Sequence, residues 1–323
     1  MSERIGIGVI GLGVMGQRML ARIAEHPRSR VLAVWDPDAG AMAAAKERDP
    51  TLSPARTAAE VIGTPGLRCL YVASPPASHL AYADQAFDAG LAVFCEKPLT
   101  IDFDAGRRSI ARIARQKLRA AVNFSLASSP GLAAMAAAVK DGSIGEPRAV
   151  EIELAFDRWP RAWQAAAGHW LAERAEGGFT REVLSHFVFV LQRALGPATI
   201  ERSQPDYPPD GVGAERALEA RLSAGGVPVT IEGRVGGSHP DFNRMTLLGS
   251  LGVVEVHDWF GLRRRRGDAH WVVERSPQEN RAIGQAAQLD QVAAMVEGRP
   301  HSLPGFDEAL AVQETIEALL KGR

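Results

Sequence analysis

The sequence has few of the residues that define several large protein classes. Only two of its 323 residues are cysteine, and Cys69 and Cys95 both lie in apolar segments with a strand pattern. Two isolated cysteines in such segments predict reduced core residues and no disulfide. No Cys/His spacing of a zinc site occurs, so no metal is expected. A G-x-S-x-G motif is also missing, which argues against a serine hydrolase.

Long apolar runs and an excess of charge are missing as well. No apolar run approaches the roughly 20 residues that cross a bilayer. The N-terminal segment MSERIGIGVIGLG has charge and glycine where a signal peptide needs an unbroken apolar core. The formal net charge is -1, which predicts neither nucleic-acid binding nor attraction to an anionic membrane. We therefore expect a cytoplasmic protein whose partner is a small molecule.

Lysine is scarce in this sequence, so each lysine at a constrained position is a candidate for a specific chemical role. Of 37 basic residues only five are lysine, so arginine is the usual cation of this chain. A lysine at a constrained position therefore requires a chemical reason.

Short apolar runs alternate with helical patterns over the first 124 residues. The predicted strands are 4–10, 30–35, 67–73, 92–95 and 120–124, and the predicted helices are 14–25, 39–46, 80–89 and 105–116. Almost continuous apolar strands joined by helices predict a parallel sheet with both faces covered. Residues 1–124 are therefore predicted to form a Rossmann domain that binds a dinucleotide.

The pattern changes after residue 124. Residues 148–156 alternate as in a strand with one buried face, and 217–223 and 227–234 flank a Gly-Gly turn as in a hairpin. Further strands are predicted at 245–248, 252–257 and 270–275, and helices at 131–140, 285–296 and 306–320. We predict an α/β fold in which residues 125–323 form an α+β domain with an open, mainly antiparallel sheet. This domain is expected to bind substrate and to form a homodimer or homotetramer, and its last helix to pack back on the Rossmann domain.

A glycine-rich motif follows the first predicted strand directly and precedes a helix. Gly11, Gly13 and Gly16 form G-x-G-x-x-G, with Val14 and Met15 between the last two. The first glycine permits the tight turn, the second lets the backbone approach a pyrophosphate, and the third allows close packing of helix and strand. These five residues are predicted to bind a dinucleotide.

An acidic residue ends the second strand. Asp36 follows Gly16 by 20 residues, where a carboxylate binds the adenine ribose hydroxyls. The alternative is a surface turn. A carboxylate repels a 2′-phosphate, so NAD is favoured, while Arg18 and Arg48 leave NADP open.

Polar residues also follow the later strands of the first domain. Ser74, Pro75 and His79 belong to a stiff loop after the third strand, and we expect them to contact the cofactor, although a plain strand-to-helix turn is the alternative. Glu96 and Lys97 follow the fourth strand, and we expect both to contact the cofactor, although a solvated Glu–Lys turn is the alternative. A lysine can exchange a proton with a substrate oxygen, which arginine cannot. Pro98 restricts Lys97 to extended geometry.

The second domain contributes a carboxylate and a histidine. Glu182 and His186 are four residues apart in a predicted helix that follows Gly177-Gly178, so they share one face. A carboxylate beside an imidazole orients the ring and raises its basicity. In isolation such a pair is usually a solvated helix face. We predict Lys97, Glu182 and His186 as catalytic and substrate-binding residues, together with Asn123 and Trp170 as substrate-binding residues.

Four of these segments, in this order, resemble the glucose–fructose oxidoreductase/inositol dehydrogenase (Gfo/Idh/MocA) family. They are GLGVMG, SPPASH, CEKPL and the Gly-Gly stretch that leads to His186, and the resemblance extends over essentially the whole chain. It implies a Rossmann domain followed by an open, mainly antiparallel domain, with the substrate between that sheet and the nicotinamide. It also implies that Lys97 is the active-site lysine and His186 the histidine that transfers the proton.

The chain departs from the family pattern at two places. Glu182 stands where the family usually has aspartate, and the stretch 125–130 lacks a basic residue often found there. The implied reaction is hydride transfer between a carbinol carbon and nicotinamide, with His186 exchanging the hydroxyl proton and Lys97 assisting, or with these roles reversed. We expect a dehydrogenase or reductase for a sugar, polyol or related compound. The alternatives are a reductase for an imine or non-sugar carbonyl and a non-catalytic dinucleotide sensor or corepressor.

Overall fold

The computed structural model describes residues 4–167, 169–238 and 240–322. Its chain forms two compact units. The first consists of Met1–Ala127 and Gln285–Leu310, and the second of Ser128–Gly284 and Ala311–Arg323. A segment near the C-terminus therefore belongs to the same unit as the N-terminal residues. Among the described helices, none is both long and apolar enough to cross a membrane.

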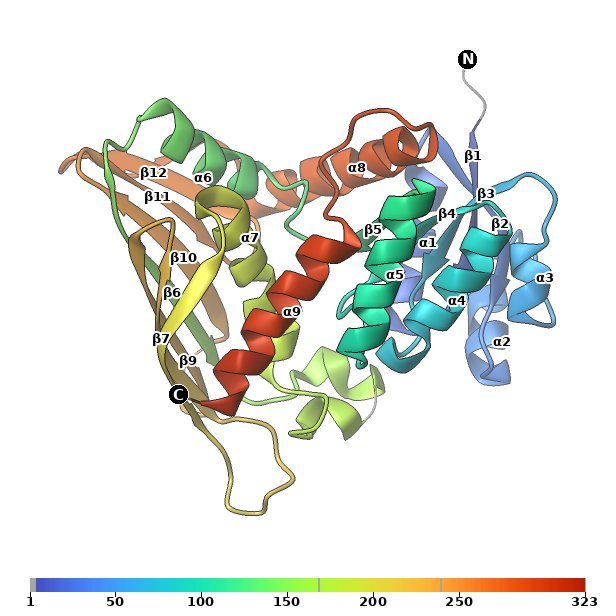
Figure 1. The fold of residues 1–323 in the computed structure, drawn as a ribbon, viewed down its shortest axis with the longest axis horizontal. Helices are drawn as coiled ribbons and strands as arrows, with labels where there is room; N and C mark the ends of the chain where they lie inside the picture. Colours follow the sequence, from blue (N-terminus) through green and yellow to red (C-terminus); the bar gives the residue numbers. More distant parts are fainter. Residues whose placement is uncertain (1–3, 168, 239, 323) are drawn as a thin grey trace. The chain divides into compact units, whose positions relative to one another are not determined.

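The first unit is built around a parallel sheet of five strands in the order β2-β1-β3-β4-β5 (Figure 1). Its strands are β1 (Ile5–Ile10), β2 (Ser29–Trp35), β3 (Leu67–Val72), β4 (Ala92–Glu96) and β5 (Ala120–Asn123). Its helices are α1 (Val14–Glu25), α2 (Ala39–Arg48), α3 (Ala58–Ile62), α4 (Pro76–Asp88) and α5 (Phe103–Gln116). The chain reverses its direction of winding between β1 and β3, and ligands of open α/β sheets bind beyond the carboxyl ends of the strands at such a point.

The core of the first unit includes residues from both ends of the chain. Every residue of β1 and β4 is buried, as a sheet covered on both faces requires. Buried side chains of α8 (Pro277–Val296), including Leu289, Val292 and Met295, belong to the same apolar cluster as Tyr71 and Phe94. Burial of these α8 residues explains why Gln285–Leu310 belongs to the first unit.

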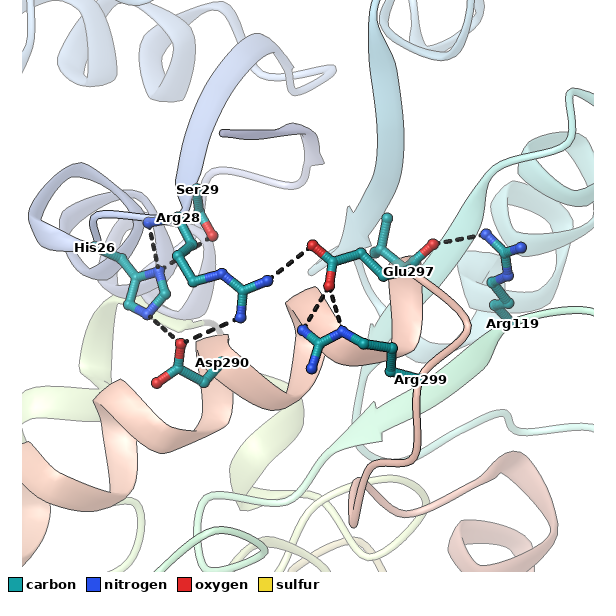
Figure 2. Close-up of polar contacts among 8 residues, drawn as sticks. His26, Arg28, Ser29, Arg119, Asp290, Glu297 and Arg299 are labelled. Atoms are coloured by element: carbon teal, nitrogen blue, oxygen red, sulfur yellow. Dashed lines mark hydrogen bonds and ion pairs between the residues drawn. The ribbon is translucent and has the colours of Figure 1, made fainter. Parts of the chain in front are cut away.

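Ion pairs fix the position of this returning segment (Figure 2). The Arg28 guanidinium contacts the Glu297 carboxylate at 2.8 Å, and Arg299, which belongs to the returning segment itself, contacts the other Glu297 oxygen. Arg119 donates to the Val296 carbonyl oxygen at 2.6 Å, and the His26 ring lies 3.5 Å from Asp290. Exposed or half-exposed ion pairs each contribute about 0–1 kcal/mol. Apolar burial therefore supplies most of the binding energy of the segment, and the polar contacts set its register.

The second unit contains an eight-stranded sheet in the order β13-β12-β11-β10-β6-β9-β8-β7 (Figure 1). The strands are β6 (Pro147–Phe156), β7 (Ala198–Asp206), β8 (Ala217–Ala224), β9 (Val227–Val235), β10 (Phe242–Gly249), β11 (Gly252–His257), β12 (Gly261–Arg266) and β13 (Val272–Val273). All neighbours are antiparallel except β6 and β9, which pair in parallel. The predicted fold class, a Rossmann domain with a parallel sheet and a second domain with a mainly antiparallel sheet, is confirmed.

Alternation of apolar and polar residues gives this sheet one buried face. Along β9, Val227, Val229 and Ile231 are buried while the residues between them are exposed. The helices α6 (Pro130–Asp141) and α7 (Ser185–Leu195) pack against each other, α6 also against β11 and β12, and α7 against β8. The helix α9 (Phe306–Lys321) begins in the first unit and continues in the second.

Candidate functional site

The glycine loop at the end of β1 has two positions that exclude any side chain. Gly11 has a φ of +95°, and a Cβ added there would lie 2.4 Å from the carbonyl carbon of Ala73 and 2.5 Å from the nitrogen of Ser74. A Cβ added at Gly16 would lie 1.9 Å from the Gly11 oxygen. The absence of a side chain therefore lets the loop lie directly against the residues that follow β3 and lets the start of α1 lie close to the end of β1.

Gly13 has the opposite environment. It is exposed, and a Cβ built on it would have no atom within 4 Å among the residues the structure describes. Gly13 is the N-cap of α1 and has no side chain to cap the helix, and the first turn, which includes Val14 and Met15, contains no acidic residue. Backbone N–H groups and the positive end of the helix dipole are therefore available to an anion. This environment fits the pyrophosphate of a dinucleotide.

The carboxylate of Asp36 is fixed beside this loop. One oxygen accepts the Leu12 backbone N–H at 2.7 Å, and the other accepts the Asp38 backbone N–H at 2.8 Å. Asp36 is half-buried, and each carboxylate oxygen has a further lone pair for a ligand hydroxyl. The predicted ribose-binding carboxylate and the glycine loop are therefore in direct contact. Arg48 donates to Gln17 on α1 at 2.7 Å.

The loop after β3 is tied to the loop after β4 by His79. This histidine is 1% exposed, and its two ring nitrogens lie 2.7 Å from the Ser74 carbonyl oxygen and 2.9 Å from the Pro98 carbonyl oxygen. Burial lowers the pKa of His79, and its contacts with the carbonyl groups act in the opposite direction. The Ser74 hydroxyl lies 2.7 Å from that of Ser78, and Pro75 is exposed. The imidazole of His79 therefore joins two predicted cofactor loops from within the protein.

Glu96 is the centre of a buried hydrogen-bond network. Its Oε1 atom accepts the hydroxyl of Tyr71 and the amide N–H of Asn123, the latter at 2.6 Å. Gln288 of α8 donates to the Asn123 oxygen at 2.8 Å. All four residues are at most 5% exposed. Burial raises the pKa of Glu96, while the bonds from Tyr71 and Asn123 and the charge of Lys97 lower it.

Lys97 follows Glu96 directly and is half-buried, at the carboxyl end of β4. Its peptide bond with Pro98 is cis. Lys97 is therefore adjacent to a buried network whose members come from β3, β4, β5 and α8.

In the second unit, a buried carboxylate fixes the start of the helix that contains the predicted acid–base pair. The Glu215 oxygen accepts the Thr180 backbone N–H at 2.8 Å, and the Glu215 side chain is 2% exposed. Burial raises the pKa of Glu215, and the bonds from Thr180 lower it. A Cβ at Gly178, whose φ is +99°, would lie 2.2 Å from the other Glu215 oxygen, so only glycine fits there.

An arginine holds the same helix start from another direction. Arg181 binds Glu317 at 2.6 and 2.9 Å through two nitrogens and donates to the carbonyl oxygens of Arg174 and Gly177. The first helical turns, η3 (Thr180–Leu184), have π geometry and continue into α7. Such π segments often occur at functional sites.

His186 lies on α7 against an aromatic side chain. It is 4% exposed, and its ring meets that of Trp259 edge-on with the centroids 5.3 Å apart. Asp258 and Trp259 have φ values of 47° and 69°, in a left-handed region that side chains rarely adopt. The backbone N–H of Trp259 donates to the Asn243 side-chain oxygen at 2.7 Å, which stabilises this turn.

The remaining predicted residues divide between the units. Glu182 lies in η3 and Trp170 in η2 (His169–Ala172), and both are half-buried in the second unit. Lys97 and Asn123 belong to the first unit. The predictions did not include Tyr71, Gln288 or Glu215. Tyr71 follows the apolar pattern of a core strand, and nothing in the sequence indicates the partners of the other two.

A family model matches the N-terminal part of the first unit. Residues 5–124 match a family model described as an oxidoreductase family with an NAD-binding Rossmann fold, Gfo/Idh/MocA. The chain is 28% identical over 265 residues to inositol 2-dehydrogenase 1 of Saccharopolyspora erythraea, which covers 78% of this chain and 74% of that protein. It is 33% identical over 145 residues to inositol 2-dehydrogenase of Gluconacetobacter diazotrophicus, a match that spans 43% of that relative's length.

Solved structures share the fold over almost the whole chain. The WlbA dehydrogenase from Bordetella pertussis, in complex with NADH and UDP-GlcNAcA, aligns with a TM-score of 0.82 at 19% identity and covers 99% of this chain and 96% of that one. An oxidoreductase from Desulfitobacterium hafniense, described as NADPH-dependent, aligns with a TM-score of 0.84 at 16% identity, with coverage of 99% and 96%.

The first unit therefore has an NAD-binding Rossmann fold of the oxidoreductase type. Residues 5–124 match the Gfo/Idh/MocA oxidoreductase family model. The resemblance predicted from the motifs and the predicted nicotinamide dinucleotide cofactor are both confirmed.

Proposed function

We propose that this protein is an NAD(P)-dependent dehydrogenase or reductase that acts on a sugar, a polyol or a related hydroxy or carbonyl compound. The observation that carries the proposal is the glycine loop, in which Gly11 and Gly16 exclude side chains while Gly13 and the start of α1 remain open to a phosphate. Two relatives are inositol 2-dehydrogenases. A protein of similar fold, KijD10 from Actinomadura kijaniata, is a 3-ketoreductase crystallised with NADP.

The residues at the carboxyl ends of β1 to β4 would hold the cofactor. Gly13, Val14 and Met15 would face the pyrophosphate with backbone N–H groups, and Asp36 would accept the ribose hydroxyls. The carboxylate of Asp36 favours NAD over NADP because it repels a 2′-phosphate. Ser74 and Pro75 would line the nicotinamide half, while buried His79 and Glu96 would hold their loops in place.

Proton transfer is assigned to Lys97 and His186. When bound, the nicotinamide accepts or supplies the hydride. His186 would exchange the hydroxyl proton of the substrate, and Glu182, four residues before it, would orient the imidazole ring. Lys97 assists as a compact cation that binds the reacting oxygen. Asn123 and Trp170 complete the set of residues proposed to contact substrate.

We also propose a cytoplasmic homodimer or homotetramer, formed through the polar face of the eight-stranded sheet. Glu219 and Glu232 are exposed and directly opposite each other on β8 and β9, and exposed Arg202 and Arg221 are opposite on β7 and β8. Like charges in register destabilise an isolated sheet. A second copy that places its basic pair over the acidic pair would remove both repulsions. Light scattering at micromolar concentration should give a mass of two or four chains, and a monomer would contradict this.

The test of the cofactor assignment is a titration of the purified protein with NADH and NADPH. Energy transfer from the tryptophans to bound nicotinamide reports binding directly. We expect NADH to bind more tightly than NADPH. A preference for NADPH would remove Asp36 from the ribose site but leave an enzyme, and failure of the folded protein to bind either cofactor would refute the proposed function.

A second measurement separates an enzyme from a non-catalytic sensor. Lys97→Met and His186→Ala should retain NADH binding and lose turnover of whichever sugar, polyol or carbonyl compound the wild type converts. A sensor requires no proton donor, so unchanged biological activity in both variants would exclude catalysis by these residues.

A further inference from the structure

The second unit contains an arginine surrounded by aromatic rings. The Cζ atom of Arg161 lies 4.7 Å from the ring centroid of Trp163, 5.5 Å from that of Trp159 and 5.6 Å from that of Phe156. Trp259 is a fourth neighbour at 5.8 Å. A guanidinium that stacks on aromatic faces keeps its charge and directs its N–H donors along its own plane.

The group is held in a defined orientation. The Nε atom of Arg161 donates to the Gln164 side-chain oxygen at 2.9 Å, and Gln164 is only 3% exposed. Trp159 is anchored by its indole N–H, which donates to the Leu171 carbonyl oxygen at 2.8 Å. The guanidinium of Arg161 and the neighbouring indole of Trp159 are therefore held in place before any ligand binds, which reduces the entropy cost of binding.

Trp259 connects this cation with the proposed proton-transfer histidine. The same indole lies 5.8 Å from the Arg161 guanidinium carbon and meets the His186 ring at 5.3 Å. On the outer side, Trp163 is 47% exposed, which is unusual for so large an apolar side chain. A fixed arginine, an exposed indole and the histidine thus belong to one cluster of the second unit.

Resting on the proposed function, we infer that Arg161 and its tryptophans form the part of the substrate site that binds an anionic group. The substrate would then be a hydroxy or carbonyl compound with a carboxylate or a phosphate. Guanidinium binds either group through two parallel charged hydrogen bonds. The indole faces would contact the C–H groups of the carbon chain.

The experiment compares ligands that differ in the anionic group alone. Calorimetry of the full chain, with and without saturating NADH, would measure binding of D-gluconate against sorbitol and of glucose 6-phosphate against glucose. We expect one anionic member of a pair to bind about 10- to 100-fold more tightly than its neutral partner, as charged hydrogen bonds imply. Which pair shows the difference decides between carboxylate and phosphate.

Variants assign the difference to Arg161. Arg161→Gln should reduce the affinity for the anion to that for the neutral partner, and Arg161→Lys should restore part of it because a single ammonium cannot bind bidentately. Trp163→Ala should lower the affinity for the anionic ligand and for its neutral partner by the same factor. Arg193→Gln is the matched control, because Arg193 also stacks on an aromatic ring, that of Phe189 at 5.2 Å, but lies two turns after His186 on α7. This variant should keep the wild-type ratio of anion affinity to neutral-ligand affinity.

The outcomes separate this inference from the proposed function. Equal affinities within both pairs for the wild type, or an anion preference that persists in Arg161→Gln, would refute the anionic site. The NADH titration of the same samples tests the cofactor assignment independently. Unchanged NADH affinity of Arg161→Gln would show that the variant is folded.

Discussion

Two alanine substitutions in the glycine loop, Gly11→Ala and Gly13→Ala, should separate effects on folding from effects on cofactor binding. In Gly11→Ala the new Cβ would occupy space 2.4 Å from backbone atoms of Ala73, at a φ of +95°. The left-handed backbone costs about 1–2 kcal/mol and the overlap about 1–3 kcal/mol. We expect Gly11→Ala to lose about 2–5 kcal/mol of unfolding free energy.

Gly13→Ala should behave in the opposite way. Gly13 has φ −64° and ψ −165°, which alanine adopts, and its added Cβ meets nothing within 4 Å among the described residues. The free energy of unfolding should change by no more than about 0.5 kcal/mol. The methyl group would instead stand where the backbone approaches the pyrophosphate, and a loss of about 1.4–2.8 kcal/mol there corresponds to 10- to 100-fold weaker NADH binding.

Two assays on the same preparations decide the question. Urea unfolding followed by circular dichroism measures stability, and energy transfer from tryptophan to NADH measures affinity. Wild-type affinity in Gly13→Ala would refute the assignment of the loop to a pyrophosphate. Wild-type stability in Gly11→Ala would refute the packing argument.

Three further predictions concern single side chains. Asp36→Asn should reduce the ratio of NADH affinity to NADPH affinity about tenfold, which equals about 1.4 kcal/mol. Paired titrations with the two cofactors measure this ratio, and an unchanged ratio would show that Asp36 does not bind the ribose. Tyr71→Phe leaves Glu96 with one donor fewer and should cost about 1–3 kcal/mol in urea unfolding, whereas half-buried Tyr82→Phe should cost little. Because burial raises the pKa of Glu215, its protonated form is favoured by folding, and this stability is lost as the pH rises above the ordinary glutamate pKa of about 4.3. The melting temperature of Glu215→Gln, relative to that of the wild type, should therefore rise as the pH is raised from acidic to neutral. A difference in melting temperature that stays constant with pH would contradict this.

Local pattern was sufficient to predict most of the first unit. The glycine motif, the apolar strands and the residues that follow them are adjacent in sequence, and in a parallel sheet the carboxyl ends of all strands meet at one edge. The prediction that Gly11, Asp36, Ser74 and Lys97 follow strands of one sheet needed only these regularities.

The second unit was less completely predicted. β12 has the sequence GLRRRR and lacks an apolar alternation; it is a strand because it pairs with β11, where Arg263 binds the buried Glu255 carboxylate at 2.7 Å. β7 was also not predicted, and its exposed residues give no periodic signal. Strands of this kind are specified by their neighbours rather than by their own residues.

The sequence by itself predicted the fold class, the resemblance to the family and the glycine loop, because each depends on short-range periodicity or spacing. Only the tertiary structure decided that Gln285–Leu310 joins the first unit, that Gln288 bonds to Asn123 from 165 residues away, and that Trp259 contacts both Arg161 and His186. A hydrogen bond or a ring contact between distant residues leaves no local pattern, since its energy depends on burial that exists only after the chain has packed.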